Sequence, residues 1–307
     1  MELFILDDQK LKEEIFDQTI KKNIQRKSVF VDQVQFVDDI PLFSWLDINP
    51  TELCNRRCVF CPRSDVDLYP NQNLHISLDL CSKIADELRS LNYKGGVALS
   101  GYGEPTLHPE FIEMVKIFGK DIRTELITSG DFITPQVAAD LYKAGISQIL
   151  VSLYNGPHQV EPFHEIFAKA KVPRSHYFLR DRWYNMESDY GVKLTNRAGT
   201  VTEGNQVEVL ENRPCFYTHY SMSIDWNGDV LLCVQDWNKK IKMGNLNNQS
   251  LLEVWSSPNF NKYRKVLGNG KRALMPCKAC NTDGTLHGKN HHEGWVNYFN
   301  IAKDQSL

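Results

Sequence analysis

Hydrophobic residues follow two alternating patterns between about residue 45 and residue 195. Short apolar runs are typical of buried strands, and apolar residues spaced three and four apart predict helices between those runs. This regular exchange of strands and helices predicts an α/β fold with a parallel sheet. The predicted strands cover residues 45–48, 97–100, 124–128 and 148–153, with weaker candidates at 176–179 and 192–195, and the predicted helices begin near residues 77, 109, 134 and 162.

The pattern changes after about residue 200. Alternating apolar residues on either side of Asn227-Gly228 predict a β-hairpin over residues 220–237, and helical spacing predicts one helix over 250–267. Ahead of the α/β region, a helix is expected over about 9–26. We therefore divide the chain into an N-terminal extension (1–44), an α/β domain (45–200) and a small second domain with a C-terminal tail (201–307).

Composition narrows the class of protein. The 307 residues are 42% hydrophobic and 24% charged, and the net charge of -3 without a long basic run gives no reason to expect nucleic acid as a partner. No segment reads as a signal peptide or a membrane span, so we expect a cytoplasmic protein. Cysteines stay reduced there, and clusters among the 8 cysteines therefore indicate metal rather than disulfides.

The most informative cluster is Cys54, Cys58 and Cys61, which directly follows the first predicted strand. This C-x3-C-x2-C spacing puts three thiolates on one short loop. A [4Fe–4S] cluster has four irons, so three cysteines leave one iron open to a small molecule. A zinc site is the alternative, but zinc usually takes four ligands in paired C-x2-C motifs.

Polar and glycine residues follow the later strands of the α/β region. The carboxyl ends of parallel strands meet at one edge, where active sites of such folds gather. Glycines there let the backbone approach a ligand closely, a carboxylate can accept from an ammonium, and an arginine can clamp a carboxylate. The candidates at these strand ends are Gly101, Gly103, Glu104, Ser129, Ser152 and Arg197.

Together, the cysteine spacing, Phe60 beside the last of the three cysteines and the Gly-Tyr-Gly-Glu turn resemble the radical SAM superfamily. The resemblance implies a partial (β/α)6 barrel that binds S-adenosylmethionine on the open iron of a [4Fe–4S] cluster. It implies that Glu104 holds the amino group, and that Ser129 and Ser152 contact the ribose or carboxylate. It also implies that Phe60 and the glycines contact the cofactor, and that a flavodoxin or ferredoxin supplies electrons.

A second set of cysteines lies downstream at Cys215, Cys233, Cys277 and Cys280. On chemistry alone, four thiolates suit a closed [4Fe–4S] cluster or a structural zinc equally well. Their order around a hairpin, a helix and a final C-x2-C resembles the twitch version of the SPASM domain. That resemblance implies one auxiliary [4Fe–4S] cluster, and so two clusters in the chain.

One cysteine and several histidines are left over. Cys81 lies on the apolar face of a predicted helix, where a buried structural thiol is expected. His287, His291 and His292 follow the last cysteine pair, and we expect them on the solvated surface, with pocket lining or metal ligation as alternatives.

Three reactions compete for a radical SAM enzyme with these features. A thiolate-ligated auxiliary cluster can accept an electron, which favours two-electron oxidation of an alcohol carbon on a small polar, sugar- or cyclitol-like substrate. The resemblance then places Arg197 between S-adenosylmethionine and the auxiliary cluster, where it would orient or deprotonate the substrate. Epimerisation would need a hydrogen donor, and Cys81 is the one spare thiol. Peptide modification usually needs a recognition domain, for which 44 residues look too short.

Overall fold

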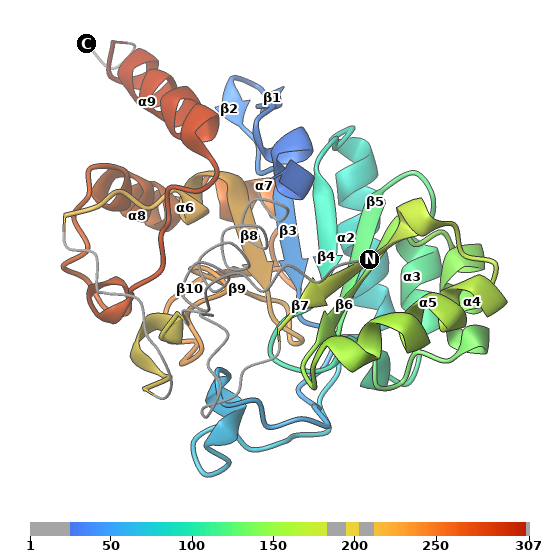
Figure 1. The fold of residues 1–307 in the computed structure, drawn as a ribbon. Coiled ribbons are helices and arrows are strands. Elements are labelled where there is room, and N and C mark those ends of the chain that lie inside the picture. The colour runs from blue at the N-terminus through green and yellow to red at the C-terminus, as the bar shows by residue number, and fades with distance from the viewer. Residues whose placement is uncertain (1–24, 183–194, 203–211, 305–307) are drawn as a thin grey trace, which may run out of the picture.

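The fold is built around one sheet of eight strands in the order β10-β9-β8-β3-β4-β5-β6-β7. The computed structural model describes residues 25–182, 195–202 and 212–304. Strands β3 to β7 are parallel, so the expected α/β fold is confirmed (Figure 1). The predicted strand at 192–195 lies almost wholly outside the described residues. The strands are β3 (Trp45–Ile48), β4 (Gly96–Leu99), β5 (Arg123–Thr128), β6 (Gln148–Leu153), β7 (Tyr177–Asp181), β8 (Ser221–Ile224), β9 (Asp229–Leu231) and β10 (Lys242–Asn245), with a separate pair β1 (Phe36–Val37) and β2 (Ile40–Pro41).

Four helices cover one face of the parallel strands (Figure 1). They begin where local signals place them: the Ser77 hydroxyl accepts from the backbone N–H of Leu80, and Thr134 caps the next-but-one helix in the same way. Cys81 is fully buried on the first of these helices, which confirms the expectation of a structural position. The helices are α2 (Leu78–Ser90), α3 (Phe111–Phe118), α4 (Pro135–Ala144) and α5 (Val160–Lys169), and short 3-10 turns are η1 (Pro62–Ser64), η2 (Pro105–Leu107), η3 (Pro157–Gln159), η4 (Arg174–His176), η5 (Arg197–Gly199) and η6 (Cys277–Ala279).

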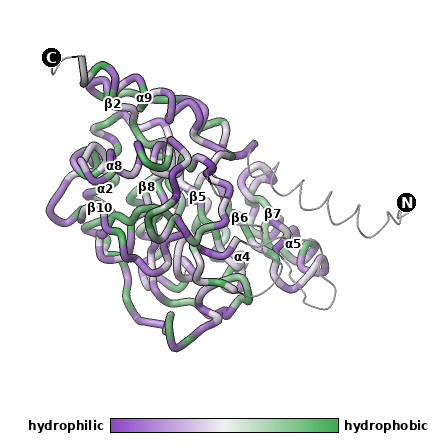
Figure 2. The backbone as a smooth tube through the Cα atoms, turned by 90° about the vertical axis from the view of Figure 1, so that its left-hand side faces the viewer, coloured by the Kyte–Doolittle hydropathy of each residue, from purple (hydrophilic) through white to green (hydrophobic). Residues whose placement is uncertain are grey.

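Strand alternation separates two cores. Leu46 and Val97 point to the helix face and join the main core, whereas Trp45 and Ala98 point to the other face. Figure 2 shows the hydrophobic colour running through the central strands, while a helix such as α5 carries both colours. Apolar side chains therefore fill the helix side, and the opposite side is left for a smaller, mixed core.

The N-terminal extension covers part of that second face. Its described part is helical from residue 25 to residue 31, so the predicted end near Arg26 was too early, because Val31 buries itself beside Trp45 and keeps the helix packed. The Lys27 ammonium lies 4.2 Å from the Trp45 ring centroid, and burial lowers the pKa of Lys27 to about 8. Arg26 pairs with Glu125 of β5. The rest of the predicted helix lies outside the described residues.

The C-terminal part extends the same sheet. Strand β8 pairs in parallel with β3, and β8 and β9 form the predicted hairpin around Asn227-Gly228. The single helix expected over 250–267 was wrong: Ser257 caps a new helix and Pro258, which lacks an N–H, starts it. Strand β10 and the last helix were not predicted. The helices are α6 (Tyr217–Tyr220), α7 (Leu251–Trp255), α8 (Pro258–Gly268) and α9 (Lys289–Asp304).

The last helix corrects one expectation about the tail. His291 lies on α9 with no exposed surface, and burial lowers the pKa of His291 to about 4. Nδ1 of His292 lies 3.2 Å from Nε2 of His219 on α6. The prediction that His291 and His292 lie on the solvated surface is therefore wrong, because α9 packs against α6. No helix in the described residues has the length and apolar character to cross a membrane.

Candidate functional site

The first cysteine set lies on a loop that its neighbours hold in place. The Cys54 N–H donates to Oδ1 of Asn71 over 2.9 Å, and Nδ2 of Asn71 donates back to the Cys54 carbonyl over 2.7 Å. The Cys61 N–H donates to the Cys58 carbonyl over 2.9 Å. Burial, and then the charges of Cys61 and Cys54, raise the pKa of Cys58 to about 12. The three thiols therefore stand close enough to influence one another, as three ligands of one cluster must.

Two glycines let the next strand end lie directly on this loop. A Cβ on Gly103 would lie 2.1 Å from the Thr51 carbonyl oxygen and 2.5 Å from that of Leu53. Gly101 has a φ of 140°, and a Cβ there would lie 2.7 Å from Oδ1 of Asn49. Only glycine fits such approaches to backbone. The β4 end and the cysteine loop are thus one packed unit, as expected if both contact one ligand.

Glu104 lies in this unit with 4% of its surface exposed. Its carboxylate accepts from the Ser129 N–H over 2.7 Å, from the Thr106 hydroxyl over 2.7 Å and from the Thr128 hydroxyl. Its charge also adds to the burial that raises the pKa of Cys54. The structure thus brings Glu104, Ser129 and Cys54 together. A buried carboxylate whose printed hydrogen bonds all come from neutral donors suits an ammonium ligand, which fits the amino group of S-adenosylmethionine.

Ser152 has a partner that the sequence did not reveal. Arg180 of β7 lies opposite Ser152 in the register of the sheet, and its Nη2 donates to the Ser152 hydroxyl over 2.8 Å. Burial lowers the pKa of Arg180 to about 10, and its Nε has no hydrogen-bond partner in the described residues. A guanidinium near the carboxyl ends of the strands, with its Nε–H still able to donate, suits a carboxylate ligand. Arg180 could have been found from the sequence only by its position just after the weakly predicted strand at 176–179.

Phe60 and Arg56 connect the cysteine loop to the ends of later strands. The Phe60 ring stacks on Tyr154 with centroids 5.4 Å apart, and the Arg56 guanidinium lies 5.2 Å from the same ring. Arg56 also forms a two-pronged pair with Asp131, which follows β5. A direct contact of Phe60 with the cofactor remains a prediction; the structure places it as a support of the loop.

A buried charge network lies behind the loop. Glu52 accepts from Nδ2 of Asn49 over 2.9 Å and from Nη2 of Arg63 over 2.6 Å, and it pairs with Lys239. Lys239 also pairs with Asp225 over 2.8 Å, and Asn49 donates to the same Asp225. These five residues, called the Glu52 network below, link the first cysteine loop to the β8–β9 hairpin. Sequence reasoning missed them because the two contacts that join the loop to the hairpin, Asn49 to Asp225 and Glu52 to Lys239, are 176 and 187 residues apart in the chain.

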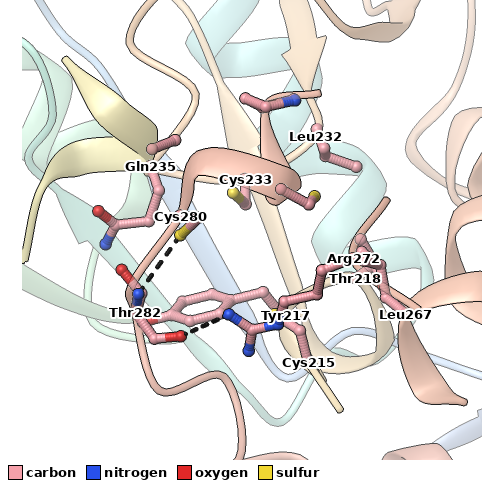
Figure 3. A pocket seen from close by; sticks show the side chains of 13 residues that line it. Cys215, Tyr217, Thr218, Leu232, Cys233, Gln235, Leu267, Arg272, Cys280 and Thr282 are labelled. Carbon is pink, nitrogen blue, oxygen red and sulfur yellow. Dashed lines mark hydrogen bonds between the residues drawn. The ribbon is translucent and has the colours of Figure 1, made fainter. Parts of the chain in front are cut away.

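The second set of cysteines surrounds one cavity, shown in Figure 3. Burial, and then Cys215 and Cys280, raise the pKa of Cys277 to about 12, and burial and the other three cysteines also raise the pKa of Cys233. The remaining lining is mixed and includes the apolar Leu232 and Leu267 as well as the polar Gln235 and Arg272.

Four thiols around one cavity match the four ligands of a closed [4Fe–4S] cluster. Among the described residues, no three histidine, cysteine or acidic side chains are grouped as ligands of a single ion. Each thiolate of a [4Fe–4S] cluster binds a different iron, so its ligands stand farther apart than the four around one zinc. The four cysteines around one cavity therefore fit an auxiliary cluster.

Arg197 lies between the two cysteine sets. Its Nη1 donates to Oε1 of Gln235 over 3.4 Å, two residues beyond Cys233. Burial raises the pKa of Cys61, and the charge of Arg197 partly offsets that rise, so Arg197 also lies near the first set. Its backbone is strained, with a φ of 46° at Arg197 and 54° at Ala198.

A reciprocal pair of asparagines holds that strained turn on the auxiliary site. The Asn196 N–H donates to Oδ1 of Asn281 over 2.8 Å, the Asn281 N–H donates to Oδ1 of Asn196 over 3.3 Å, and Nδ2 of Asn196 donates to the Ala279 carbonyl. The turn that carries Arg197 and the loop that carries Cys277 and Cys280 are therefore one unit.

Comparison with known proteins agrees with this geometry. The family model of the radical SAM superfamily matches residues 48–177, and that of the SPASM iron–sulfur cluster-binding domain matches residues 215–281. An S-adenosyl-L-methionine-dependent 2-deoxy-scyllo-inosamine dehydrogenase of Niallia circulans is 28% identical over 78% of this chain and 93% of its own. A GTP 3',8-cyclase of Clostridium perfringens is 23% identical over 78% of this chain and 69% of its own.

A crystal structure of BtrN in complex with AdoMet and 2-DOIA has the same fold, with a TM-score of 0.68, 24% identity, and coverage of 82% of this chain and 98% of that one. The two family matches imply S-adenosylmethionine and two [4Fe–4S] clusters as cofactors. Each match spans one of the two sets of cysteines.

Proposed function

Because this chain belongs to the radical SAM superfamily and carries a SPASM iron–sulfur domain, we propose that it oxidises an alcohol carbon on a small polar, sugar- or cyclitol-like substrate to a ketone. The observation that carries the proposal is the four-cysteine cavity directly beside the turn of Arg197. A closed cluster has no open iron for substrate, so its use is to take up an electron.

When bound, S-adenosylmethionine and the two clusters supply a 5′-deoxyadenosyl radical that removes a hydrogen atom from carbon, together with an acceptor for the remaining electron. The chain's own residues prepare this chemistry. Glu104, which accepts from the Ser129 N–H, would also accept from the amino group of the cofactor, and Arg180, which donates to Ser152, would pair with its carboxylate. Arg197 orients the substrate hydroxyl between the two sites, and the hydroxyl proton passes to water, because a guanidinium donates hydrogen bonds and has no acceptor for it. The substrate thus loses one hydrogen atom, one proton and one electron.

The position of Cys81 favours oxidation over epimerisation. An epimerase needs a donor that returns a hydrogen atom to substrate, and a thiol can serve. Cys81 is fully buried in the core on α2, and burial raises its pKa to about 12. The other seven cysteines belong to the two ligand sets. We further propose a flavodoxin or ferredoxin as the source of the reducing electron and the cytoplasm as the place of action.

The test is anaerobic turnover of the reconstituted enzyme with dithionite, S-adenosylmethionine and a panel of cyclitols and sugars that includes 2-deoxy-scyllo-inosamine. We expect 5′-deoxyadenosine and ketone in equal amounts, with deuterium moving from the carbinol carbon of a labelled substrate into 5′-deoxyadenosine. Release of 5′-deoxyadenosine with an epimer that carries solvent hydrogen, and without ketone, would overturn the proposal. The Cys54/Cys58/Cys61→Ala variant is the control for background cleavage.

A further inference from the structure

Arg272 is a buried cation at the auxiliary site that has no part in the proposed oxidation. It lies between α8 and η6 with 8% of its surface exposed, and it lines the same cavity as the four cysteines (Figure 3). Sequence reasoning gave no reason to single it out, because it follows Gly270 and Lys271 in a loop without a motif.

Three backbone carbonyls fix the guanidinium. Nε donates to the Arg213 carbonyl over 2.9 Å, Nη2 to the Pro214 carbonyl over 3.1 Å, and Nη1 to the Thr282 carbonyl over 2.9 Å. Two of these carbonyls immediately precede Cys215, and the third lies two residues after Cys280. Arg272 therefore touches both chain segments that bring these two thiols to the cavity.

These three partners are neutral, so none of them cancels the charge. Asp283, a carboxylate in the same loop, pairs instead with Arg213 over 3.2 Å. Arginine keeps its charge at every pH at which proteins work. Because Arg272 lines the same cavity as the four cysteines, its charge acts on the group that those cysteines hold there.

A fixed cation beside a cluster changes the relative energy of its two oxidation states. A cluster held by four thiolates is an anion, and reduction adds one more negative charge. In a buried site of low effective dielectric, a nearby positive charge stabilises the more negative state. The potential of such clusters depends on net charge, hydrogen bonds and solvent exposure around them.

We propose that Arg272 raises the reduction potential of the auxiliary cluster and so makes it a better acceptor for the electron that leaves the substrate. The effect on potential requires the auxiliary cluster alone; its catalytic consequence rests on the proposed function. A failed search for substrate therefore leaves the electrostatic part of the proposal open to a separate test.

The test is an EPR-monitored redox titration of the full chain in the Cys54/Cys58/Cys61→Ala background, which leaves the auxiliary cluster as the reporting centre. Arg272→Gln removes the charge, Arg272→Lys keeps it, and both alter the hydrogen bonds. Lys278→Gln removes an exposed charge inside the same C-x2-C motif and is the matched control. Iron content is measured for each variant.

We expect the midpoint potential of R272Q to be more negative than that of the parent, with R272K close to the parent and K278Q shifted less than R272Q. Equal shifts in R272Q and R272K would assign the effect to lost hydrogen bonds and overturn the proposal. Loss of the cluster from both variants would also overturn it, in favour of a structural role. If R272Q alone loses iron, Arg272→His replaces it as the test, because a histidine is more positively charged at pH 6 than at pH 8. The midpoint potential of this variant must then be more negative at pH 8 than at pH 6, and equal potentials at the two pH values overturn the proposal.

Discussion

Replacing Lys239 with methionine should weaken the connection between the first cysteine loop and the β8–β9 hairpin. The Lys239 ammonium lies 2.8 Å from Oδ2 of Asp225 and also pairs with Glu52, and both carboxylate side chains are at most 10% exposed. Methionine keeps the length and the apolar stem of the side chain but removes the charge. The variant therefore leaves two buried carboxylates that share one cation fewer.

The size of the effect follows from these contacts. A buried hydrogen bond to a charged group contributes roughly 1.5–3 kcal/mol, and Lys239 makes two. Its side chain keeps 25% exposure, and Asn49 and Arg63 still serve the carboxylates, so solvent and these partners reduce the loss. We expect the free energy of unfolding to fall by about 2–3 kcal/mol. At roughly 2–4 °C per kcal/mol, Tm should fall by about 4–12 °C.

The assay is thermal unfolding under anaerobic conditions, followed by circular dichroism, with Lys240→Met as the control. Lys240 is the adjacent lysine and is exposed, so its loss should change Tm by no more than about 1–2 °C. In a double-mutant cycle, Glu52→Gln combined with K239M should cost less than the sum of the two single changes. Equal Tm values for K239M and K240M would refute the reasoning, because they would mean that the Glu52 network is held together without its lysine.

Three further predictions concern the two cofactor sites and the tail. The Cys54/Cys58/Cys61→Ala variant should fall from about eight irons to about four by anaerobic iron and sulfide analysis, whereas retained zinc with no iron would show a structural metal at the second site. Gly103→Ala should weaken S-adenosylmethionine binding roughly tenfold or more in equilibrium titration, because its Cβ would lie 2.1 Å from a backbone oxygen that cannot rotate away; unchanged affinity would contradict this packing. Burial lowers the pKa of His291 to about 4, so between about pH 6.5 and pH 4 the unfolded state binds a proton at this position that the folded state does not. The free energy of unfolding should therefore fall by up to about 3 kcal/mol as the pH is lowered from about 6.5 to 4. His291→Phe should reduce this pH dependence in denaturant titrations at several pH values.

Local signals in the sequence predicted the elements that depend on neighbours in the chain. The first strand was predicted over the residues that form β3, and Ser77 and Thr134 cap helices as expected. The Ser257-Pro258 start signal was equally local, and the single helix predicted across it ignored it. Cysteine spacing singled out Cys54, Cys58 and Cys61, whereas the grouping of the second four came from the resemblance to the twitch domain; the structure places those four around one cavity.

Features that depend on tertiary contacts could not be predicted in this way. Arg180 becomes informative only when the register of β6 and β7 places it opposite Ser152. Strand β10 has little alternation of its own and forms against β9. The burial of His291 depends on α9 packing over α6, and Arg272 looks like any loop arginine until three carbonyls surround it. Patterns along the sequence do not reveal contacts between residues that are far apart in the chain.

The pairing of β8 with β3 has a consequence for synthesis on the ribosome. Trp45 to Ile48 lie beside Ser221 to Ile224, so about 175 residues must be made between the two strands. Until the later strand emerges, one edge of β3 has no partner, and an unpaired edge invites pairing with other chains. Long-range pairings of this kind also form late in folding. The nascent chain should therefore depend on protection from aggregation until the hairpin has left the ribosome.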